Sequence, residues 1–168
     1  MRTFSSDYKR YKKELRFVFN EPSIIMVFLY RLRRKIYKYP LVAKFICAII
    51  VEPFYVFLTL LFGIYLPKTC EIGPGLMIYH FGGIILNPKT KIGANCTLRH
   101  HVTIGNRKEI DDVPELGNNV NIGCGAVIIG KIKIGNNVDI GANALVLSDV
   151  PDNCVAVGNP AIVKPKRM

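Results

Sequence analysis

Histidine and cysteine side chains are the groups of this chain best suited to chemistry near neutral pH. The 168 residues contain only three histidines, His80, His100 and His101, and five cysteines. An imidazole exchanges protons near physiological pH, so a histidine is able to take the proton of an attacking hydroxyl group. Two histidines and a cysteine are also able to bind zinc. The fold that positions these groups decides between the two kinds of chemistry.

A six-residue repeat in the second half of the chain predicts that fold. An aliphatic residue returns at every sixth position, usually followed by glycine, at Leu116, Ile122, Ile128, Ile134, Ile140 and Val146. One hexad supplies a short strand and a corner, so three hexads close one triangular coil. We therefore expect a parallel β-helix with a core of stacked aliphatic residues. Frequent asparagine and glycine suit the corners, where positive φ angles are needed.

The repeat extends backwards to about Ile72 with one change of register. It runs through Ile84 and resumes two residues out of step at Leu86, so we expect a small bulge near Asn87-Pro88. The polar residues 105–115 predict a loop that leaves one corner. The predicted division is a helical N-terminal region, 1–66, followed by a β-helix domain, 67–168, that includes this loop and a C-terminal tail.

Four residues stand two positions after an aliphatic residue of the repeat, and this common offset places them in one column on the outside. Neighbouring coils are about 4.8 Å apart, so these side chains stack. The column begins with histidine and ends with small residues, which predicts a groove for a slender molecule. Its members are His80, His100, Cys124 and Ala142.

The chain resembles the hexapeptide-repeat acyltransferases, within them the serine acetyltransferase-like branch, and especially its relatives for O-acetylation of capsule and exopolysaccharide. The resemblance covers about 63–164. It rests on the repeat, on Met77-Ile78-Tyr79-His80-Phe81-Gly82-Gly83-Ile84 and on Val157-Gly158-Asn159-Pro160-Ala161. It implies a left-handed parallel β-helix, a homotrimer, acetyl-CoA as donor and active sites between adjacent subunits.

The resemblance also implies roles for individual residues. His80 matches the general base that takes the proton of the acceptor hydroxyl. Coenzyme A is expected along the later coils, against Gly123, Cys124, Gly141 and Ala142, with basic Lys164 near its phosphates. For Gly123 and Gly141, the packing of the repeat itself is an equally good explanation. His100 is expected either to stack on His80, which disfavours double protonation, or to contact the acceptor or solvent.

Departures from the family pattern concern the acceptor. Tyr79 stands where serine acetyltransferases have an acidic residue, and Asp112-Val113 replaces an Arg-His pair that belongs to the serine-binding groups. The acid that orients the catalytic imidazole aligns near Tyr65. Tyr65 itself, or Asp111 from a neighbouring subunit, is therefore a candidate for that supporting role. These departures favour a sugar hydroxyl of a surface polysaccharide or lipid-linked precursor over serine as acceptor.

The N-terminal third is both basic and apolar. Up to Lys38, eleven basic residues face three acidic ones, which accounts for +8 of the net charge of +11. The segment 45–66 is almost wholly apolar, but Glu52-Pro53 lies within it, and an acid at the centre of a bilayer costs about 3 kcal/mol. We therefore expect two helices with a break at Glu52-Pro53 that lie on the inner leaflet rather than a spanning helix. Helices packed on the β-helix or on a neighbouring subunit are the alternative.

Three other functions are compatible with parts of the sequence. Serine O-acetylation is the alternative within the class, and a zinc-dependent lyase like the carbonic anhydrases built on the same scaffold is the alternative from another class. No metal is expected, because the small-residue groove has no purpose in a lyase. A non-catalytic scaffold is the third possibility. The absence of nucleic-acid motifs argues against a nucleic-acid partner. The five cysteines are odd in number and form no C-x-x-C pair, which suggests a reduced, cytoplasmic protein. Together with the N-terminal helices, this predicts a location at the cytoplasmic face of the membrane.

Overall fold

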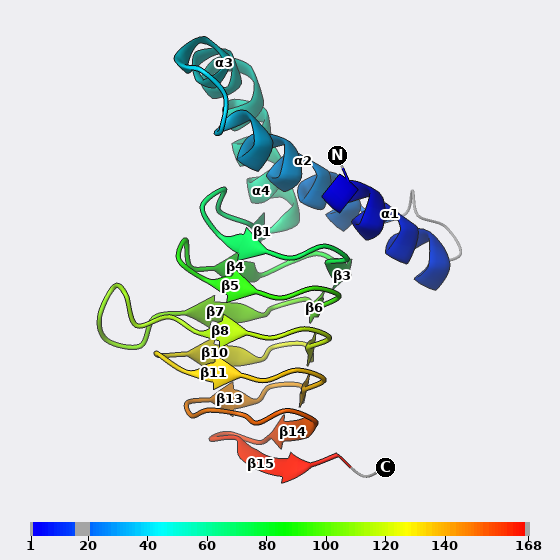
Figure 1. Cartoon of the computed structure of the whole chain (residues 1–168), viewed down its shortest axis with the longest axis vertical. Helices are drawn as coiled ribbons and strands as arrows, with labels where there is room; N and C mark the ends of the chain where they lie inside the picture. The colour runs from blue at the N-terminus through cyan, green and yellow to red at the C-terminus, as the bar shows by residue number, and fades with distance from the viewer. Residues whose placement is uncertain (1, 16–20, 167–168) are drawn as a thin grey trace.

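The computed structural model describes residues 2–15 and 21–166, and it confirms a parallel β-helix preceded by helices. Three sheets form the sides of a prism (Figure 1). The first contains β1 (Ile64–Tyr65), β4 (Ile84–Leu86), β7 (Thr103–Gly105), β10 (Val127–Ile129) and β13 (Leu145–Val146). The second contains β2 (Glu71–Ile72), β5 (Lys91–Ile92), β8 (Glu115–Leu116) and β11 (Lys133–Ile134).

The third sheet has six strands and is the one that matters for the site. It contains β3 (Met77–Tyr79), β6 (Thr97–Arg99), β9 (Asn121–Ile122), β12 (Asp139–Ile140), β14 (Cys154–Val157) and β15 (Ile162–Pro165). All of its pairings are parallel except that of β14 with β15. The aliphatic residues of the hexads fill the prism, and Ile122 and Ile128 are completely buried.

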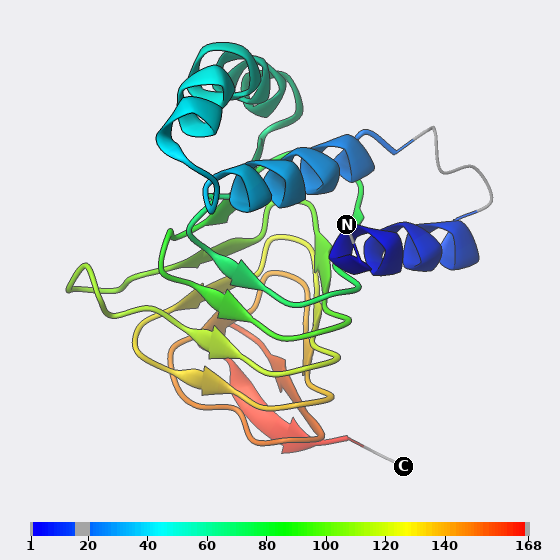
Figure 2. The same ribbon diagram turned by 45° about the horizontal axis from the view of Figure 1, so that its top comes forward.

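The N-terminal helices close the open end of the prism. They are α1 (Arg2–Glu14), α2 (Ser23–Ile36), α3 (Leu41–Ile46), a π-helical segment (Cys47–Val51) and α4 (Glu52–Phe62). Figure 2 shows α2 across that end. The first coil has no preceding coil to satisfy its backbone polar groups, and such an edge is a liability when it is uncovered.

Side chains of α1 and α2 supply the missing hydrogen bonds. The Asp7 carboxylate accepts from the backbone N–H of Leu76 at 2.8 Å, and the Tyr11 hydroxyl accepts from that of Ile78 at 2.9 Å. Arg31 donates to the carbonyl oxygens of Ile72 and Gly73 and forms an ion pair with Asp7. The helices are therefore part of the fold of the β-helix.

Two details differ from the expectations. The chain does not break at Glu52-Pro53: α3, the π-helical segment and α4 follow one another directly, and Pro53 lies in the first turn of α4, where its missing N–H costs nothing. The register change also lies elsewhere than Asn87-Pro88, since the partners of Ile78 and Ile85 are Leu98 and Thr103. Ile85 lies seven positions after Ile78, whereas Thr103 lies only five positions after Leu98, so the two extra residues lie in the corner after His80.

Candidate active site

The third sheet brings the predicted column together. Ile78 pairs with Leu98, Leu98 with Ile122, and Ile122 with Ile140. Residues two positions after these, His80, His100, Cys124 and Ala142, therefore stack along the corner that follows the sheet. The His80 and His100 ring centroids are 6.0 Å apart. The ring centroid of His101 lies 5.5 Å from that of His100, and the two ring planes are 78° apart.

The corner that carries His80 has an unusual backbone. His80 has a φ of 64°, and Gly82 and Gly83, which follow it, have φ of 112° and 64°. A histidine tolerates the left-handed region at a cost of the order of 1 kcal/mol, and such strain concentrates at functional sites. In the equivalent corner of the next coil, the positive φ falls on His101 instead. The two extra residues thus shift His80 away from the standard conformation of the repeat.

Glu21 is a site residue that the sequence did not reveal. It comes from the chain just before α2, and its Oε1 lies 3.6 Å from Nδ1 of His80. The side chain of Glu21 is only 16% exposed, whereas that of His80 is 67% exposed. Within the described residues, the buried Oε2 of Glu21 and Nδ1 of His100 have no hydrogen-bond partner. A carboxylate therefore lies beside one nitrogen of the imidazole, at a distance longer than a hydrogen bond, while most of the imidazole side chain is exposed to solvent.

The three residues predicted to support His80, which are Tyr79, Tyr65 and Asp111, lie on different elements of the fold. Tyr79 donates a hydrogen bond to Glu14, and burial, together with this bond, raises the pKa of the Tyr79 hydroxyl. Tyr65 is an exposed residue of β1 in the first sheet, opposite Ile85. Asp111 lies in the loop after β7 and forms an ion pair with Lys89 of its own chain. Within one protomer, the carboxylate beside His80 is therefore that of Glu21 rather than Asp111.

The residues expected to line coenzyme A lie along the lower part of the same sheet. Gly123 and Cys124 directly follow β9, Gly141 and Ala142 follow β12, and exposed Lys164 lies on β15 opposite Val155. A Cβ atom on Gly123 would come within 2.5 Å of the backbone nitrogen of Ala142. Close contact between coils therefore explains this glycine by itself, while Cys124 remains partly exposed beside it.

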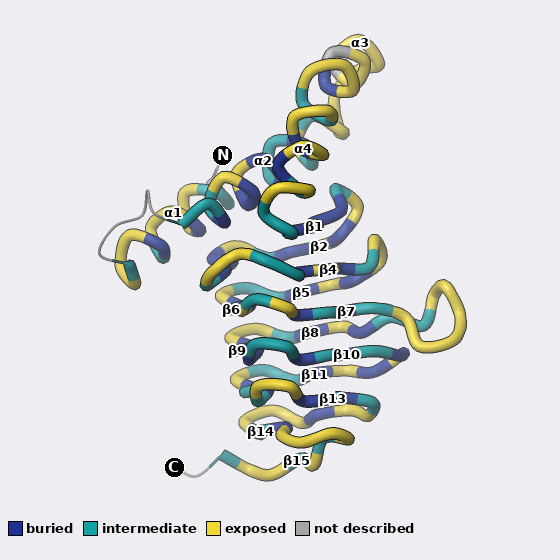
Figure 3. The backbone as a smooth tube through the Cα atoms, turned by 180° about the vertical axis from the view of Figure 1, so that it is seen from behind, coloured by how far each residue is buried: buried dark blue, intermediate teal, exposed yellow. Residues whose placement is uncertain are grey.

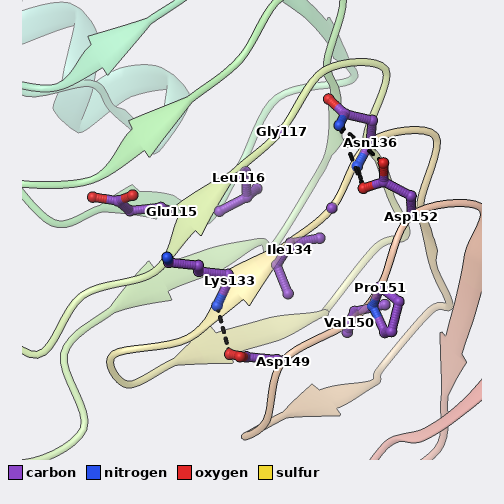
Figure 4. Close-up of a pocket in the computed structure, with 11 residues that line it drawn as sticks. Glu115, Leu116, Gly117, Lys133, Ile134, Asn136, Asp149, Val150, Pro151 and Asp152 are labelled. Atoms are coloured by element: carbon purple, nitrogen blue, oxygen red, sulfur yellow. Dashed lines mark hydrogen bonds between the residues drawn. The ribbon is translucent and has the colours of Figure 1, made fainter.

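A hollow lies on another side of the prism, and it shows that polar side chains around a hollow do not by themselves make a functional site. Figure 4 shows that it is lined by the ends of β8 and β11 and the chain before β14. Asp149 accepts from the backbone N–H of Lys133 at 2.8 Å, and Asp152 accepts from that of Asn136 at 2.7 Å. These carboxylates are thus engaged in joining one coil to the next.

The column also bears on the metal-dependent alternative. Among the residues that the structure describes, no group of three or more histidine, cysteine, aspartate or glutamate side chains has a geometry that would hold a metal ion. His80, His100 and Cys124 stack at the spacing of the coils rather than around a common point. The structure therefore adds no support for the zinc-dependent lyase.

Comparison with known proteins connects this geometry with acetyl transfer. Residues 114–148 match the family described as bacterial transferase hexapeptide (six repeats). The putative colanic acid biosynthesis acetyltransferase WcaB of Escherichia coli (strain K12) is 39% identical over 104 residues, which cover 61% of this chain and 64% of that protein. The probable serine acetyltransferase 1 of Oryza sativa subsp. japonica is 40% identical over 102 residues, which cover 60% of this chain. The match spans only 34% of the length of the rice relative.

Solved structures extend the likeness to the N-terminal helices. The serine acetyltransferase of Neisseria gonorrhoeae, in complex with serine, is 27% identical with a TM-score of 0.81, and the match covers 96% of this chain and 67% of that one. The serine acetyltransferase of Brucella abortus strain S19, in complex with coenzyme A, is 23% identical with a TM-score of 0.80 and covers 99% and 68%. At that identity, the second comparison concerns the fold alone.

Proposed function

Because the chain belongs to the hexapeptide-repeat transferase family, we propose that it transfers an acetyl group from acetyl-CoA to a sugar hydroxyl of a surface polysaccharide or lipid-linked saccharide. The observation that carries this proposal is the pair formed by His80 and Glu21 at the head of the column. An alcohol is a poor nucleophile at neutral pH, and a fixed neutral imidazole is the base it needs.

In the proposed reaction, His80 takes the proton of the acceptor hydroxyl as its oxygen attacks the thioester carbonyl. Collapse of the tetrahedral intermediate breaks the carbon–sulfur bond, and the proton passes from the imidazole to the departing thiolate of coenzyme A. The products are an acetyl ester and coenzyme A with its free thiol. Glu21 is a positioning residue here, since it fixes the ring and stabilises the positive charge formed on it.

In this proposal, the donor acetyl-CoA lies along the small residues that follow the histidines in the column. Its pantetheine arm follows the column past Cys124 and Ala142, and its phosphates approach Lys164, which is exposed on β15. This path brings the thioester up to His80. Support comes from the small side chains that end the column, at Cys124 and Ala142.

A homotrimer completes the proposed site. The side chain of His80 is 67% exposed in a single protomer, so one chain offers no wall on the far side of the imidazole. A base that works on an alcohol needs a site from which water is excluded. The facing surface of an adjacent protomer supplies that wall, and Asp111 or Tyr65 of the neighbour is then able to contact the acceptor.

Serine is the second candidate acceptor, because similar proteins of rice and Neisseria gonorrhoeae are serine acetyltransferases. The replacement of the serine-binding groups by Tyr79 and Asp112-Val113 favours the sugar. Release of coenzyme A measured side by side with L-serine and with a panel of sugar acceptors separates the two. Faster turnover of L-serine than of any sugar would overturn the sugar assignment and leave acetyl transfer standing.

Two matched substitutions test the role of His80. His80→Asn and His101→Asn both replace a histidine of positive φ by a residue that adopts this conformation easily, so neither adds backbone strain. The first should lower kcat about 10²- to 10⁴-fold. The second should leave acetyl transfer almost unchanged. Equal activity of His80→Asn and the parent protein would exclude His80 as the base.

A further inference from the structure

The helical segment 41–62, which comprises α3, the π-helical segment and α4, is apolar on nearly all sides. Those of its side chains that the structure describes pack on the protein along only one side. Its buried contacts are made by Cys47, Tyr55 and Leu58, which follow one another at helical spacing. The rest of its circumference carries exposed apolar side chains, at Leu41, Val42, Phe45, Ile49, Ile50, Phe54, Val56, Phe57, Leu60 and Leu61. A helix that is apolar all round is normally buried, so this surface, called here the apolar helical face, lacks its partner.

The apolar helical face projects away from the prism. Figures 1 and 2 show α3 and α4 standing beyond the end of the β-helix, and Figure 3 shows them largely exposed. Leu41 and Leu60, at its two ends, are 80% and 81% exposed. No helix among the described residues is long and apolar enough to cross a membrane. The geometry therefore suits a helix that lies along a surface.

A basic and aromatic rim borders this face at the turn between α2 and α3. Lys35, Lys38 and Lys44 are exposed, and so are Tyr37 and Tyr39. The Lys44 ammonium lies 5.2 Å from the centre of the Tyr37 ring, and that of Lys68 lies 5.3 Å from it. Lysine and tyrosine at the edge of an apolar surface are the groups that settle at the level of lipid headgroups.

The one acid of the segment faces the protein rather than the apolar helical face. Glu52 accepts hydrogen bonds from Arg33 at 2.7 Å and from Lys68 at 3.0 Å, on the side packed against α2. Its charge is therefore neutralised by basic partners. In the sequence, Glu52 argues against a helix that spans the bilayer. In the fold it is paired with basic residues on the protein side, so it does not oppose shallow contact of the other side with lipid.

We propose that the apolar helical face docks on the surface of an anionic lipid bilayer, with its basic rim on the headgroups. Charge selects this partner over a second copy of the chain, because a copy would bring the same rim and a net charge of +11 against it. Anionic headgroups attract each basic residue near the surface, and apolar side chains enter the boundary with the acyl chains.

The docked surface continues to the candidate active site. Phe62 ends α4, and its ring packs edge-on against Phe81 with centroids 5.8 Å apart. Phe81 directly follows His80 and is 51% exposed. Docking therefore brings the His80 corner close to the headgroups. If the proposed acetyl transfer holds, an acceptor saccharide carried on a lipid reaches the base without leaving the bilayer.

Vesicle flotation of the full chain tests the docking independently of acetyl transfer. Phosphatidylcholine vesicles are compared with vesicles of phosphatidylcholine and phosphatidylglycerol, and the protein should float with the anionic ones. The variant Phe57→Gln, Leu60→Gln, Leu61→Gln should lower partitioning at least about tenfold. Lys35→Gln, Lys38→Gln, Lys44→Gln should lower it about a hundredfold on anionic vesicles only. Ile110→Gln, Ile162→Gln is the matched control, since it removes exposed apolar side chains outside the face, and should bind as the parent does.

Three results would overturn the proposal. The first is failure of the parent chain to float with anionic vesicles, and the second is equal flotation of the apolar variant and the parent. The third is a smaller assembly for the apolar variant in sedimentation velocity, which would assign the face to a second copy of the chain. Acetylation of a soluble acceptor by every variant shows that the variants are folded. If the parent chain itself does not acetylate any acceptor, that result counts against the proposed function and not against the docking.

Discussion

The Glu21 carboxylate faces the imidazole of His80, with Oε1 3.6 Å from Nδ1, and it reaches this position from the N-terminal helical region rather than from the β-helix. The second carboxylate oxygen is buried without a partner among the described residues. Burial of an ionised oxygen is costly unless a cation or a donor compensates it. In the proposed reaction, the proton that His80 takes up would provide that compensation transiently.

We predict that Glu21→Gln lowers kcat by about 10- to 100-fold, the usual effect of losing the carboxylate that orients a working imidazole. The amide keeps the size of the side chain but loses the charge that stabilises the imidazolium. The KM for acetyl-CoA should hardly change, because the proposed donor site lies along β9 and β12. Steady-state kinetics with both substrates varied measure the two parameters separately.

Two further variants control this experiment. Glu21→Asp keeps the charge and should recover part of the activity, whereas a merely structural Glu21 would give no such rescue. Glu71→Gln removes an exposed carboxylate from β2 in the second sheet and should behave as the parent protein. A rise in KM for acetyl-CoA with unchanged kcat in Glu21→Gln would contradict the positioning role.

The corner after His80 gives a prediction on stability. Gly83 has a φ of 64°, and a Cβ on it would lie 2.2 Å from Nδ1 of His101. Gly83→Ala therefore adds both backbone strain and a clash, and should lower the free energy of unfolding by roughly 1–3 kcal/mol. Gly105→Ala is the matched control, since a Cβ there meets no atom within 4 Å and φ is not positive. Urea unfolding of both variants measures the difference; equal stabilities would contradict the strain.

The β-helix could be predicted because its information is local and repeated. Each hexad contains one aliphatic residue that marks the buried position, and the six-residue spacing gives the register between coils. The column could therefore be predicted from the sequence; its members are His80, His100, Cys124 and Ala142. The position of the two extra residues could not, since Ile84 and Leu86 both read as core residues and both are in fact buried. Glu21 was missed because its contact with His80 depends on how α1 and α2 cap the first coil. No periodicity links these two parts of the chain.

The proposed path of coenzyme A predicts a selective chemical reactivity. Cys124 is partly exposed in the column, whereas burial raises the pKa of the Cys70 thiol to about 12. Iodoacetamide should therefore label Cys124 well before Cys70, because the thiolate is the reactive form. Acetyl-CoA, which has no free thiol to consume the reagent, should slow labelling of Cys124 in proportion to its occupancy of the site. Peptide mass spectrometry over time follows each cysteine.

The variant Cys124→Ala shows which thiol is labelled rapidly, because the rapid phase of labelling should be absent from this variant. An equal rate of Cys124 labelling with and without saturating acetyl-CoA would place the donor site away from the column. Acetyl transfer measured on the same samples shows whether the enzyme is active while the test is made.

Glu52 gives a prediction on pH. Partial burial by itself raises the pKa of its carboxyl, but hydrogen bonds and charge from Arg33 and Lys68 outweigh this, and the pKa lies below its ordinary value of 4.5. A lowered pKa in the folded state stabilises the fold above pH 4.5, and this contribution is lost as the pH falls through the folded-state pKa. Glu52→Gln should therefore unfold more easily than the parent at pH 7, by about 1–3 kcal/mol for charged hydrogen bonds.

The difference between Glu52→Gln and the parent should shrink as the pH falls from 4.5 through the lower folded-state pKa, because the carboxyl of the parent then becomes protonated and also uncharged. Glu115→Gln is the control: the pKa of Glu115 is likewise lowered, by Lys91, but this ion pair is exposed and screened by solvent. Its substitution should change stability much less at pH 7. Urea unfolding of the three proteins at pH 7 and at a series of pH values from 4.5 downwards measures both effects. A gap between Glu52→Gln and the parent that stays constant over this range would show that packing of the side chain, rather than its charge, joins α4 to α2.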